Sequence, residues 1–301
     1  MNYWYAENFE KESKNENISD LLMNGYTVVK NSLDTACIDK FLSDYEKVKF
    51  ETLSKYANQL DREDCLNGMY RRLTNLHLKI ESALELFSKN SALEVTDYFF
   101  GESTTLYTSL FFERGSAQEC HRDTPYFWTY PGYGYFGVWL ALEDINPNSG
   151  PLMVIPKSHK IIDTDLFRKS IGDLERADKG LLNPQSEFLW LRYQSEIQKK
   201  CNEGMLRAEN ITINKGDTII WHPQLMHGGS KILDDSLSRK SFVMHVTPRG
   251  MNVFGQEKYF DPSVELQDFS RDLSIKYIKN NDRLIRQTGL WSIAHKIFLN
   301  I

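Results

Sequence analysis

The sequence predicts a mainly β protein with flanking helices, built as one domain over residues 1–301. Its 301 residues are 41% hydrophobic and 13% aromatic, which is enough to bury one large core. Segments rich in β-forming residues are concentrated between about 104 and 249, whereas apolar residues recur at helical spacing within 18–101. We therefore expect a β core supported by an N-terminal helical region.

The N-terminal region contains one early strand and two helical segments. After Gly25, residues 26–30 form a short β-branched run that is typical of a strand. Asp34 can cap a helix, and its apolar positions are Cys37, Ile38, Phe41, Leu42 and Tyr45. A second helical region covers about 76–99 and has Gly101 after its end. These helices are expected to cover the outside of a sheet.

The expected core consists of strands at 104–112, 136–143, 152–155 and 239–247. An insertion dense in charge, residues 161–204, interrupts it and contains a helical pattern around 187–201. Such an insertion can form a lid or an oligomer contact, and the sequence does not choose between them. After residue 249 we expect a helical extension over 254–301, with helical patterns at 262–286 and 289–298.

The formal net charge of −5 gives no indication of nucleic-acid binding. Residues 271–301 differ, because six Lys or Arg and two Asp give them a net +4. This basic segment can rest on an anionic membrane surface or dock on its own domain. The four cysteines form no CxxC pair, no leader pattern opens the chain and no apolar run is long enough to span a bilayer. We therefore expect a cytoplasmic location.

The segment Cys120-His121-Arg122-Asp123 indicates a metal site. In an extended strand the side chains of His121 and Asp123 project to one face while Arg122 points away. A histidine and a carboxylate supply two of the three ligands of an open iron(II) site, and a second histidine would complete the set. The pair alone is a weak signal, because such pairs are commonly ordinary surface or core residues.

Three histidines, His222, His227 and His245, are candidates for the third ligand. His227 precedes two glycines at an expected strand end, where backbone can approach a metal closely, and lies twelve residues before Arg239. His227 is therefore preferred, with His222 as the alternative. His159 is a rival by residue type only.

Further motifs follow the His-x-Asp pair in a characteristic order. They are Trp139–Asp144, Asn148–Pro156, Ser158–Lys160, Gly216–Thr218, His227 and Arg239. In this order and spacing the chain resembles the phytanoyl-CoA hydroxylase-like family of iron(II)- and 2-oxoglutarate-dependent dioxygenases. The run 150–160 is most similar to that of the ectoine hydroxylases, and the matching core covers about 104–160 and 205–249.

The resemblance implies a double-stranded β-helix, a jelly-roll core of the cupin type. It also implies Fe(II) bound by His121, Asp123 and His227, with 2-oxoglutarate and O2 as cosubstrates. Arg239 would bind the distal carboxylate of 2-oxoglutarate, since its planar fork makes two parallel charge-assisted hydrogen bonds. Trp139 would pack against this cosubstrate. The ordinary alternatives are a surface ion pair for Arg239 and a core position for Trp139.

Other expected contacts follow from the same resemblance. Thr108 occupies the place of a residue that contacts 2-oxoglutarate, although it can equally be a plain strand residue. The aromatic window 124–136 should overhang the metal, and Phe127 lies near a substrate-contacting position of the ectoine hydroxylases. We expect Tyr126 and Phe127 to face a small-molecule or sugar-type substrate by stacking or cation-π attraction, while the other rings pack on one another.

The implied reaction is hydroxylation of an unactivated C–H bond with release of succinate and CO2. Related halogenases have a small residue where this chain has Asp123, so halogenation is disfavoured. Desaturation, cyclisation and epimerisation use the same cofactors and stay open. A non-oxidative metal-binding cupin and a non-catalytic binding protein are the alternatives from other classes. The sequence indicates neither the oligomeric state nor the identity of the substrate.

Overall fold

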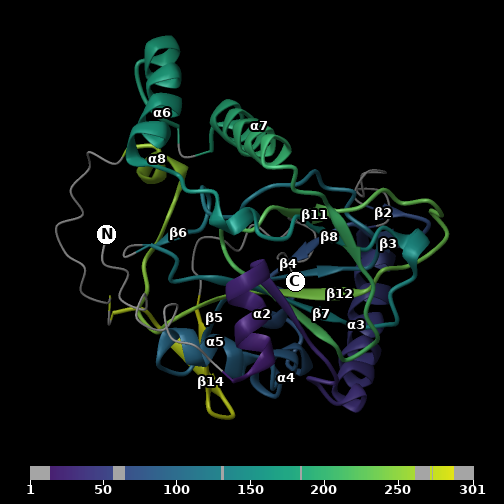
Figure 1. Ribbon diagram of the computed structural model, residues 1–301. Coiled ribbons are helices and arrows are strands. Elements are labelled where there is room, and N and C mark those ends of the chain that lie inside the picture. The colour runs from purple at the N-terminus through teal and green to yellow at the C-terminus, as the bar shows by residue number, and fades with distance from the viewer. Residues whose placement is uncertain are drawn as a thin grey trace.

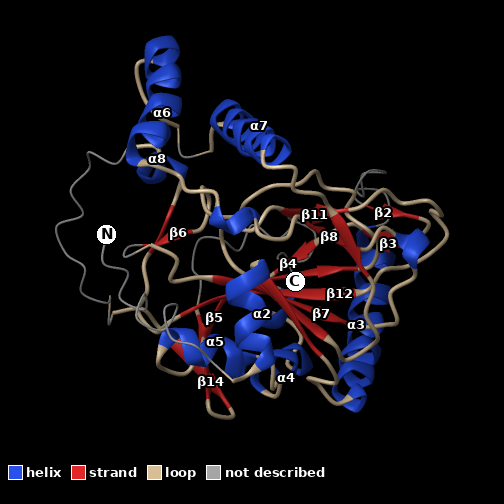
Figure 2. Ribbon diagram, in the orientation of Figure 1, coloured by secondary structure: helices blue, strands red, loops and turns tan. Residues whose placement is uncertain are grey.

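The computed structural model describes residues 14–56, 65–129, 132–183, 185–261, 272 and 274–287. Strands form the centre of the molecule and helices cover them (Figures 1 and 2). The main sheet has the order β1 (Tyr26–Val29), β10 (Thr218–Trp221), β7 (Phe136–Ala141), β12 (Ser241–Thr247), β5 (Thr105–Phe112), β15 (Arg283–Arg286) and β14 (Tyr277–Asn280), and β4 (Leu73–Thr74) also pairs with β5. The predicted mainly β architecture with flanking helices is confirmed.

Three smaller sheets accompany the main one within the described part of the chain. They are β11 (His227–Gly229), β8 (Leu152–Val154) and β9 (Glu209–Ile211); β13 (Val253–Phe254) with β6 (Trp128–Thr129); and β2 (Cys65–Leu66) with β3 (Met69–Tyr70). The predicted strands 26–30, 104–112, 136–143 and 152–155 all form, with ends that differ by one or two residues. The fourth core strand begins at Ser241, so Arg239 precedes it instead of starting it.

Both faces of the central strands β7 and β12 are buried, and their side chains alternate between two cores. Phe242 and Met244 pack into a core shared with the N-terminal helices, whereas Val243 packs with Trp139 and Trp221 on the opposite side. The register Val243↔Trp139 places these two side chains opposite each other in the antiparallel pair. The strands are therefore almost continuously apolar, as covered strands require, and the second core lies on the side of the candidate site.

The N-terminal helices α2 (Glu16–Asn24), α3 (Thr35–Tyr56), α4 (Ser82–Ser88) and α5 (Leu93–Phe100) lie against the first of these faces (Figure 1). The predicted helical region at 76–99 is confirmed, and it consists of a 3-10 turn at Leu76–Leu78 followed by two short helices. Asn90 separates the helices: its side chain bonds Thr218 Oγ1 at 3.0 Å and accepts from the Ala92 N–H. Gly101 ends α5 with φ 67°, as expected.

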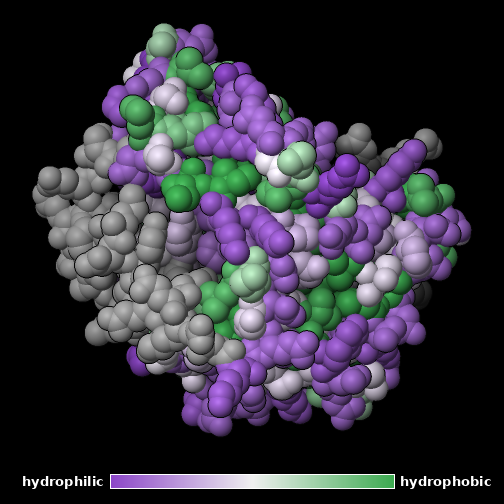
Figure 3. All heavy atoms as spheres, in the orientation of Figure 1, coloured by the Kyte–Doolittle hydropathy of each residue, from purple (hydrophilic) through white to green (hydrophobic). Residues whose placement is uncertain are grey.

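The insertion forms two helices, α6 (Asp165–Lys179) and α7 (Glu187–Glu203), next to the short α8 (Gln256–Tyr259). The helix predicted around 187–201 is confirmed, whereas α6 was not predicted. The buried apolar and aromatic residues of α7 recur every four positions at Leu189, Tyr193, Ile197 and Cys201. Its opposite side is hydrophilic where it faces the viewer in Figure 3.

The predicted helix at 262–286 is wrong where the structure describes it. Residues 277–286 form the hairpin β14–β15, which turns at Asn281 with φ 50°. Ile285 is fully buried and pairs in parallel with Leu106 of β5. This distant pairing overrides the local helical pattern. The amphipathic segment 289–298 lies outside the described residues, and no helix among the described ones is long and apolar enough to cross a bilayer.

Candidate metal centre

His121 and His227 are joined by two backbone hydrogen bonds, although they lie far apart in the sequence. The His121 N–H donates to the His227 carbonyl at 2.8 Å and the His227 N–H donates to the His121 carbonyl at 3.0 Å, as an isolated antiparallel bridge. Asp123 lies two residues further on the same face as His121. The ligand atoms of all three side chains lie within 4.8 Å of one another, close enough to hold one metal ion.

Backbone carbonyl groups orient both imidazole rings. Nδ1 of His121 lies 2.8 Å from the Glu119 carbonyl, and Nδ1 of His227 lies 3.0 Å from the Leu225 carbonyl. Because a carbonyl can only accept, each Nδ1 carries the proton and each Nε2 presents its lone pair. The Nε2 atoms lie 3.7 and 3.6 Å from the Asp123 carboxylate. This is the usual arrangement around metal-binding histidines.

Two donors hold the carboxylate of Asp123. Its Oδ2 accepts from the Tyr135 hydroxyl at 2.9 Å and from Trp221 Nε1 at 3.0 Å, whereas Oδ1 is the oxygen that lies 3.7 Å from His121 Nε2. Burial opposes ionisation of Asp123, but the facing histidines and the Trp221 N–H lower its pKa below the ordinary value. Burial lowers the pKa of His121 to about 4. At neutral pH the site therefore offers a carboxylate and a neutral imidazole.

Gly137 of β7 makes room for the indole that holds Asp123. A Cβ at this position would lie 2.0 Å from Cε2 of Trp221. We expect Gly137→Ala to displace the indole, to destabilise the protein by about 1–3 kcal/mol and to weaken Co(II) binding by about 10–100-fold. Urea unfolding and Co(II) absorption titration would measure both effects.

Gly204→Ala is the matched control, since a Cβ there would meet nothing closer than 3.4 Å. It should leave the affinity for Co(II) unchanged. Full Co(II) affinity in Gly137→Ala would show that the Trp221 hydrogen bond does not support the site.

The three candidate ligands line a cavity of about 700 Å³. Apolar and aromatic side chains make up much of its wall, and these are Tyr107, Leu110, Phe112, Tyr126, Phe127, Trp139, Leu152, Trp190, Trp221 and Val243. The expected residues Thr108, Tyr126, Phe127, Trp139 and Arg239 all line this cavity together with the ligands. It is large enough for two small molecules side by side, and most of its surface favours apolar groups.

Arg239 is buried in this cavity wall with only 2% of its surface exposed. Its guanidinium lies 5.4 Å from the ring of Phe112 and 5.5 Å from that of Trp139. Its guanidinium donates to the Arg114 carbonyl over a long distance of 3.5 Å. Among the described residues, its Nε has no hydrogen-bond partner and no carboxylate forms an ion pair with it. Burial lowers its pKa to about 10. A surface ion pair is thus excluded, and the cavity presents a cation that suits an anionic ligand.

The model of the phytanoyl-CoA dioxygenase (PhyH) family matches residues 22–241, well over half of the chain. The chain belongs to the phytanoyl-CoA dioxygenase family. The peroxisomal phytanoyl-CoA dioxygenase of Homo sapiens is 24% identical over 227 residues, which are 69% of this chain and 61% of the human protein. The phytanoyl-CoA dioxygenase domain-containing protein 1 of Danio rerio is 25% identical over 146 residues, or 48% of this chain and 44% of that protein. The chain thus spans about three fifths of the length of the human relative.

Solved structures share the fold of this phytanoyl-CoA dioxygenase family member. The non-heme alpha-ketoglutarate-dependent carbocyclase SnoK from nogalamycin biosynthesis has a TM-score of 0.60 at 15% identity, over 86% of this chain and 94% of SnoK. The epimerase SnoN from the same biosynthesis has a TM-score of 0.55 at 14% identity, over 90% of this chain and 96% of SnoN. EctD from S. alaskensis with bound Fe has a TM-score of 0.53 at 16% identity, over 79% of this chain and 80% of EctD.

The other candidate histidines of this family member lie outside the ligand group. His222 is buried between the rings of His159 and Tyr133, at centroid distances of 5.4 and 5.3 Å. His245 lines the cavity but is not one of the three clustered ligands, and its Nδ1 has no hydrogen-bond partner in the described part of the chain. Cys120 is a free thiol whose pKa burial raises to about 11.

Sequence reasoning missed three contributors: Tyr135 and Trp221, which hold Asp123, and Trp190 of the insertion, which lines the cavity. Tyr135 lies within the aromatic window, and Trp221 stands beside His222. Neither carries a signal for its role, because both depend on strand pairing. Among the rings of that window, Tyr130 lies outside the described residues.

Proposed function

We propose that the protein is an Fe(II)- and 2-oxoglutarate-dependent dioxygenase that hydroxylates an unactivated C–H bond of a small-molecule or sugar-type metabolite, with release of succinate and CO2. One observation carries this proposal: a cavity combines three clustered metal-ligand side chains with a buried guanidinium that has no described carboxylate partner. Membership of the family supports it. A non-oxidative metal-binding cupin would have no use for the second feature.

The donor set fits iron(II) and 2-oxoglutarate. His121, Asp123 and His227 would hold the metal, and two nitrogens with one oxygen make the usual ligand set of non-heme iron oxygenases. Arg239 would bind the distal carboxylate of 2-oxoglutarate, with Trp139 packed beside it. When bound, iron and 2-oxoglutarate supply the activation of O2 for attack on a C–H bond.

The chain itself contributes orientation and exclusion of water. The backbone carbonyls that accept from both Nδ1 atoms would fix the orientation of the imidazoles so that each Nε2 faces the metal. Phe127 stacks on Tyr135 with ring centroids 5.2 Å apart, and its ring lines the cavity together with Tyr126. These rings would hold the substrate by apolar and stacking contacts and keep water from the reacting carbon.

Thr108 is proposed as a weaker contact to 2-oxoglutarate. It lines the cavity and pairs across the sheet with His245, but its hydroxyl already donates to Asn75 Oδ1 at 2.5 Å. Its oxygen can therefore still accept a hydrogen bond, while donation to a carboxylate would require breaking the bond to Asn75.

We propose further that the sheets form a double-stranded β-helix within one domain.

A second outcome of the same chemistry is cyclisation or epimerisation. The similar structures SnoK and SnoN are described as a carbocyclase and an epimerase, which favours these reactions as the alternative. The mass of the product distinguishes them, because hydroxylation adds one oxygen atom, whereas ring closure by loss of two hydrogens and epimerisation add none.

The test is succinate formation from 2-oxoglutarate with Fe(II) and ascorbate, screened across fractionated metabolite pools. We expect wild-type protein to release succinate, a stimulating pool to yield a product that is heavier by one oxygen, and His227→Ala to lose more than about 99% of the turnover, since even partners outside the ligand set affect activity by about 10–100-fold.

His159→Gln is the control, because His159 bonds the Leu22 carbonyl away from the ligand cluster and Gln retains a donor. It should retain turnover. Absence of succinate in every pool, or full turnover in His227→Ala, would contradict the proposed function.

A further inference from the structure

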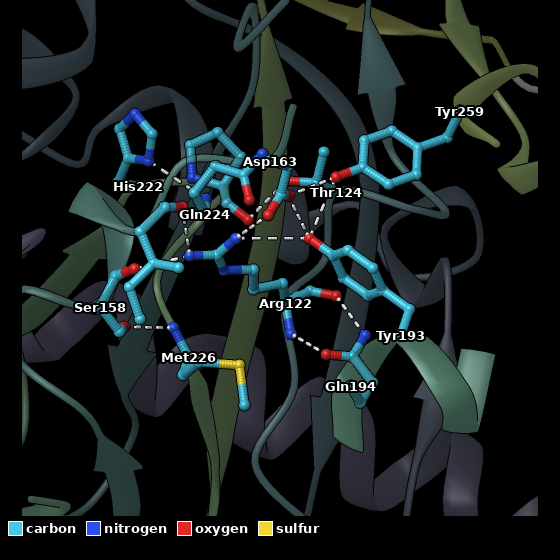
Figure 4. Close-up of polar contacts among 12 residues, drawn as sticks. Arg122, Thr124, Ser158, Asp163, Tyr193, Gln194, His222, Gln224, Met226 and Tyr259 are labelled. Carbon is cyan, nitrogen blue, oxygen red and sulfur yellow. Dashed lines mark hydrogen bonds and ion pairs between the residues drawn. The ribbon is translucent and has the colours of Figure 1, made fainter. Parts of the chain in front are cut away.

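Arg122 lies between two proposed metal ligands and points away from them. Figure 4 shows its guanidinium beside Asp163 and Tyr193 and its backbone beside Gln194, and all three of these residues belong to the insertion. The Arg122 side chain is fully buried. The strand alternation that directs His121 and Asp123 into the cavity therefore directs the intervening residue into the insertion.

Gln194 of α7 holds the backbone of this residue. The Arg122 N–H donates to Gln194 Oε1 at 2.8 Å, and Gln194 Nε2 donates to the Arg122 carbonyl at 3.0 Å. These two hydrogen bonds replace those that a neighbouring strand would make, because the side-chain amide of Gln194 pairs with both the N–H and the carbonyl of Arg122. It constrains the backbone at the point that sets the relative directions of the two ligands.

The guanidinium of Arg122 forms hydrogen bonds with the residues at the start of the insertion. Its Nη2 donates to the carbonyls of Ser158 at 2.6 Å and Ile161 at 3.0 Å, and its Nη1 donates to Asp163 Oδ1 at 2.9 Å (Figure 4). The Asp163 side chain is itself buried, so the two charges compensate each other away from water. The planar fork of arginine is needed to reach three acceptors at once.

Asp163 extends the cluster to two helices. Its Oδ2 accepts from the hydroxyl of Tyr193 on α7 at 2.5 Å and from that of Tyr259 on α8. The two hydroxyls lie 3.0 Å apart. The segment between His121 and Asp123 is thus connected through buried polar groups to the entry of the insertion, to α7 and to α8.

The same helix carries a side chain into the cavity. Trp190 precedes Tyr193 and Gln194 by three and four residues, so it lies about one turn along α7. Its ring centroid is 5.5 Å from that of His121 and 4.6 Å from that of Tyr126. A shift of α7 would therefore move a cavity wall and the backbone between the ligands together.

We propose that Arg122 and Gln194 are positioning residues that couple α7 to the metal ligands, so that metal binding orders α7 and a loosened α7 weakens metal binding. The inference rests on the proposed metal site and adds to it. Coupling of this kind is reciprocal: metal binding stabilises the ordered state of α7 by the same free energy by which the ordered state of α7 stabilises metal binding. The insertion is then a wall whose position over the substrate depends on occupancy of the metal site.

The test uses Co(II) as the probe of the full-length protein. Absorption titration gives the affinity, and hydrogen exchange with mass spectrometry gives the protection of residues 187–203 with and without Co(II). We expect Co(II) to slow exchange of α7 about tenfold in the wild type, within the usual range of coupling. Gln194→Ala should lower Co(II) affinity about tenfold and abolish the slowing. Arg122→Lys, which keeps the charge and loses the fork, should show a smaller change in both measurements.

Two controls separate coupling from general stability. Gln198→Ala removes an exposed amide one turn further along α7 that bonds Asn202 and should behave as the wild type. Ile38→Val mildly destabilises the N-terminal core without touching the cluster and should keep the response of α7 to Co(II). If Gln194→Ala does not fold, Tyr259→Phe, which removes one hydroxyl from Asp163, should show a smaller loss of both affinity and slowing.

Wild-type Co(II) affinity in folded Gln194→Ala would overturn the coupling. If Gln194→Ala does not fold, wild-type Co(II) affinity in Tyr259→Phe would overturn it. Exchange of α7 that does not respond to Co(II) in the wild type would overturn it as well. If the wild type binds Co(II) no better than His121→Ala does, the proposed metal site fails as well. The two failures are therefore distinguishable.

Discussion

Asp123→Ala is expected to abolish succinate formation and to weaken Co(II) binding by more than about 100-fold, since loss of partners outside the ligand set already costs about 10–100-fold. Asp123 supplies the oxygen of the ligand cluster and its negative charge. Absorption titration and a coupled succinate assay would measure the two effects.

The alanine variant also leaves two buried donors without an acceptor. The Tyr135 hydroxyl and the Trp221 N–H both bond Asp123 Oδ2, and each unsatisfied group costs about 1–3 kcal/mol of stability. Asp123→Asn is the matched control, because its amide oxygen still accepts from both donors while the charge is lost. We expect it to keep nearly wild-type unfolding free energy and still to lose metal. Strong Co(II) binding by both variants would contradict the assigned ligand set.

Arg239→Met is expected to weaken 2-oxoglutarate binding by at least about 30-fold, because loss of one partner from a buried charge pair costs about 2–5 kcal/mol. Its effect on stability should be opposite to that of most buried substitutions. The guanidinium is buried against Phe112 and Trp139 without a described carboxylate, so an apolar side chain of similar length removes a desolvated charge. We expect the free energy of unfolding to stay unchanged or to rise by about 1 kcal/mol.

Calorimetry of 2-oxoglutarate binding to the Co(II)-loaded protein under anaerobic conditions measures the first effect, and urea unfolding without ligand measures the second. Arg239→Lys should bind with intermediate affinity, since it keeps the charge but loses the bidentate fork. Arg207→Met, at an exposed position, should change neither quantity. Undiminished affinity in Arg239→Met would show that another group binds the cosubstrate.

Local patterns predicted the parts of this molecule that depend on local geometry. Strand alternation placed His121 and Asp123 on one face, and helical spacing identified α3 and the helix from Glu187. The preference for His227 over His222 came from its two following glycines and its interval to Arg239. The structure adds the reason for this choice, because the bridge to His121 brings only His227 into the cluster.

Features that depend on distant pairing could not be predicted from local patterns. The segment 277–286 has a helical pattern, yet it forms a hairpin because Ile285 finds a buried place beside β5. Asn90 interrupts a helix through a bond to Thr218, a residue from another part of the chain. Trp190 enters the cavity from α7, a helix of the insertion that Gln194 and Tyr193 bond to residue 122.

The main-chain bridge between residues 121 and 227 holds two of the proposed ligands together without a metal ion. Its two hydrogen bonds need no ion, so the ligands can be gathered as soon as the chain has folded. Chelation is therefore expected to remove the metal and loosen α7 while the β core stays folded. Adding Fe(II) back to the chelated protein should then restore its activity without a refolding step.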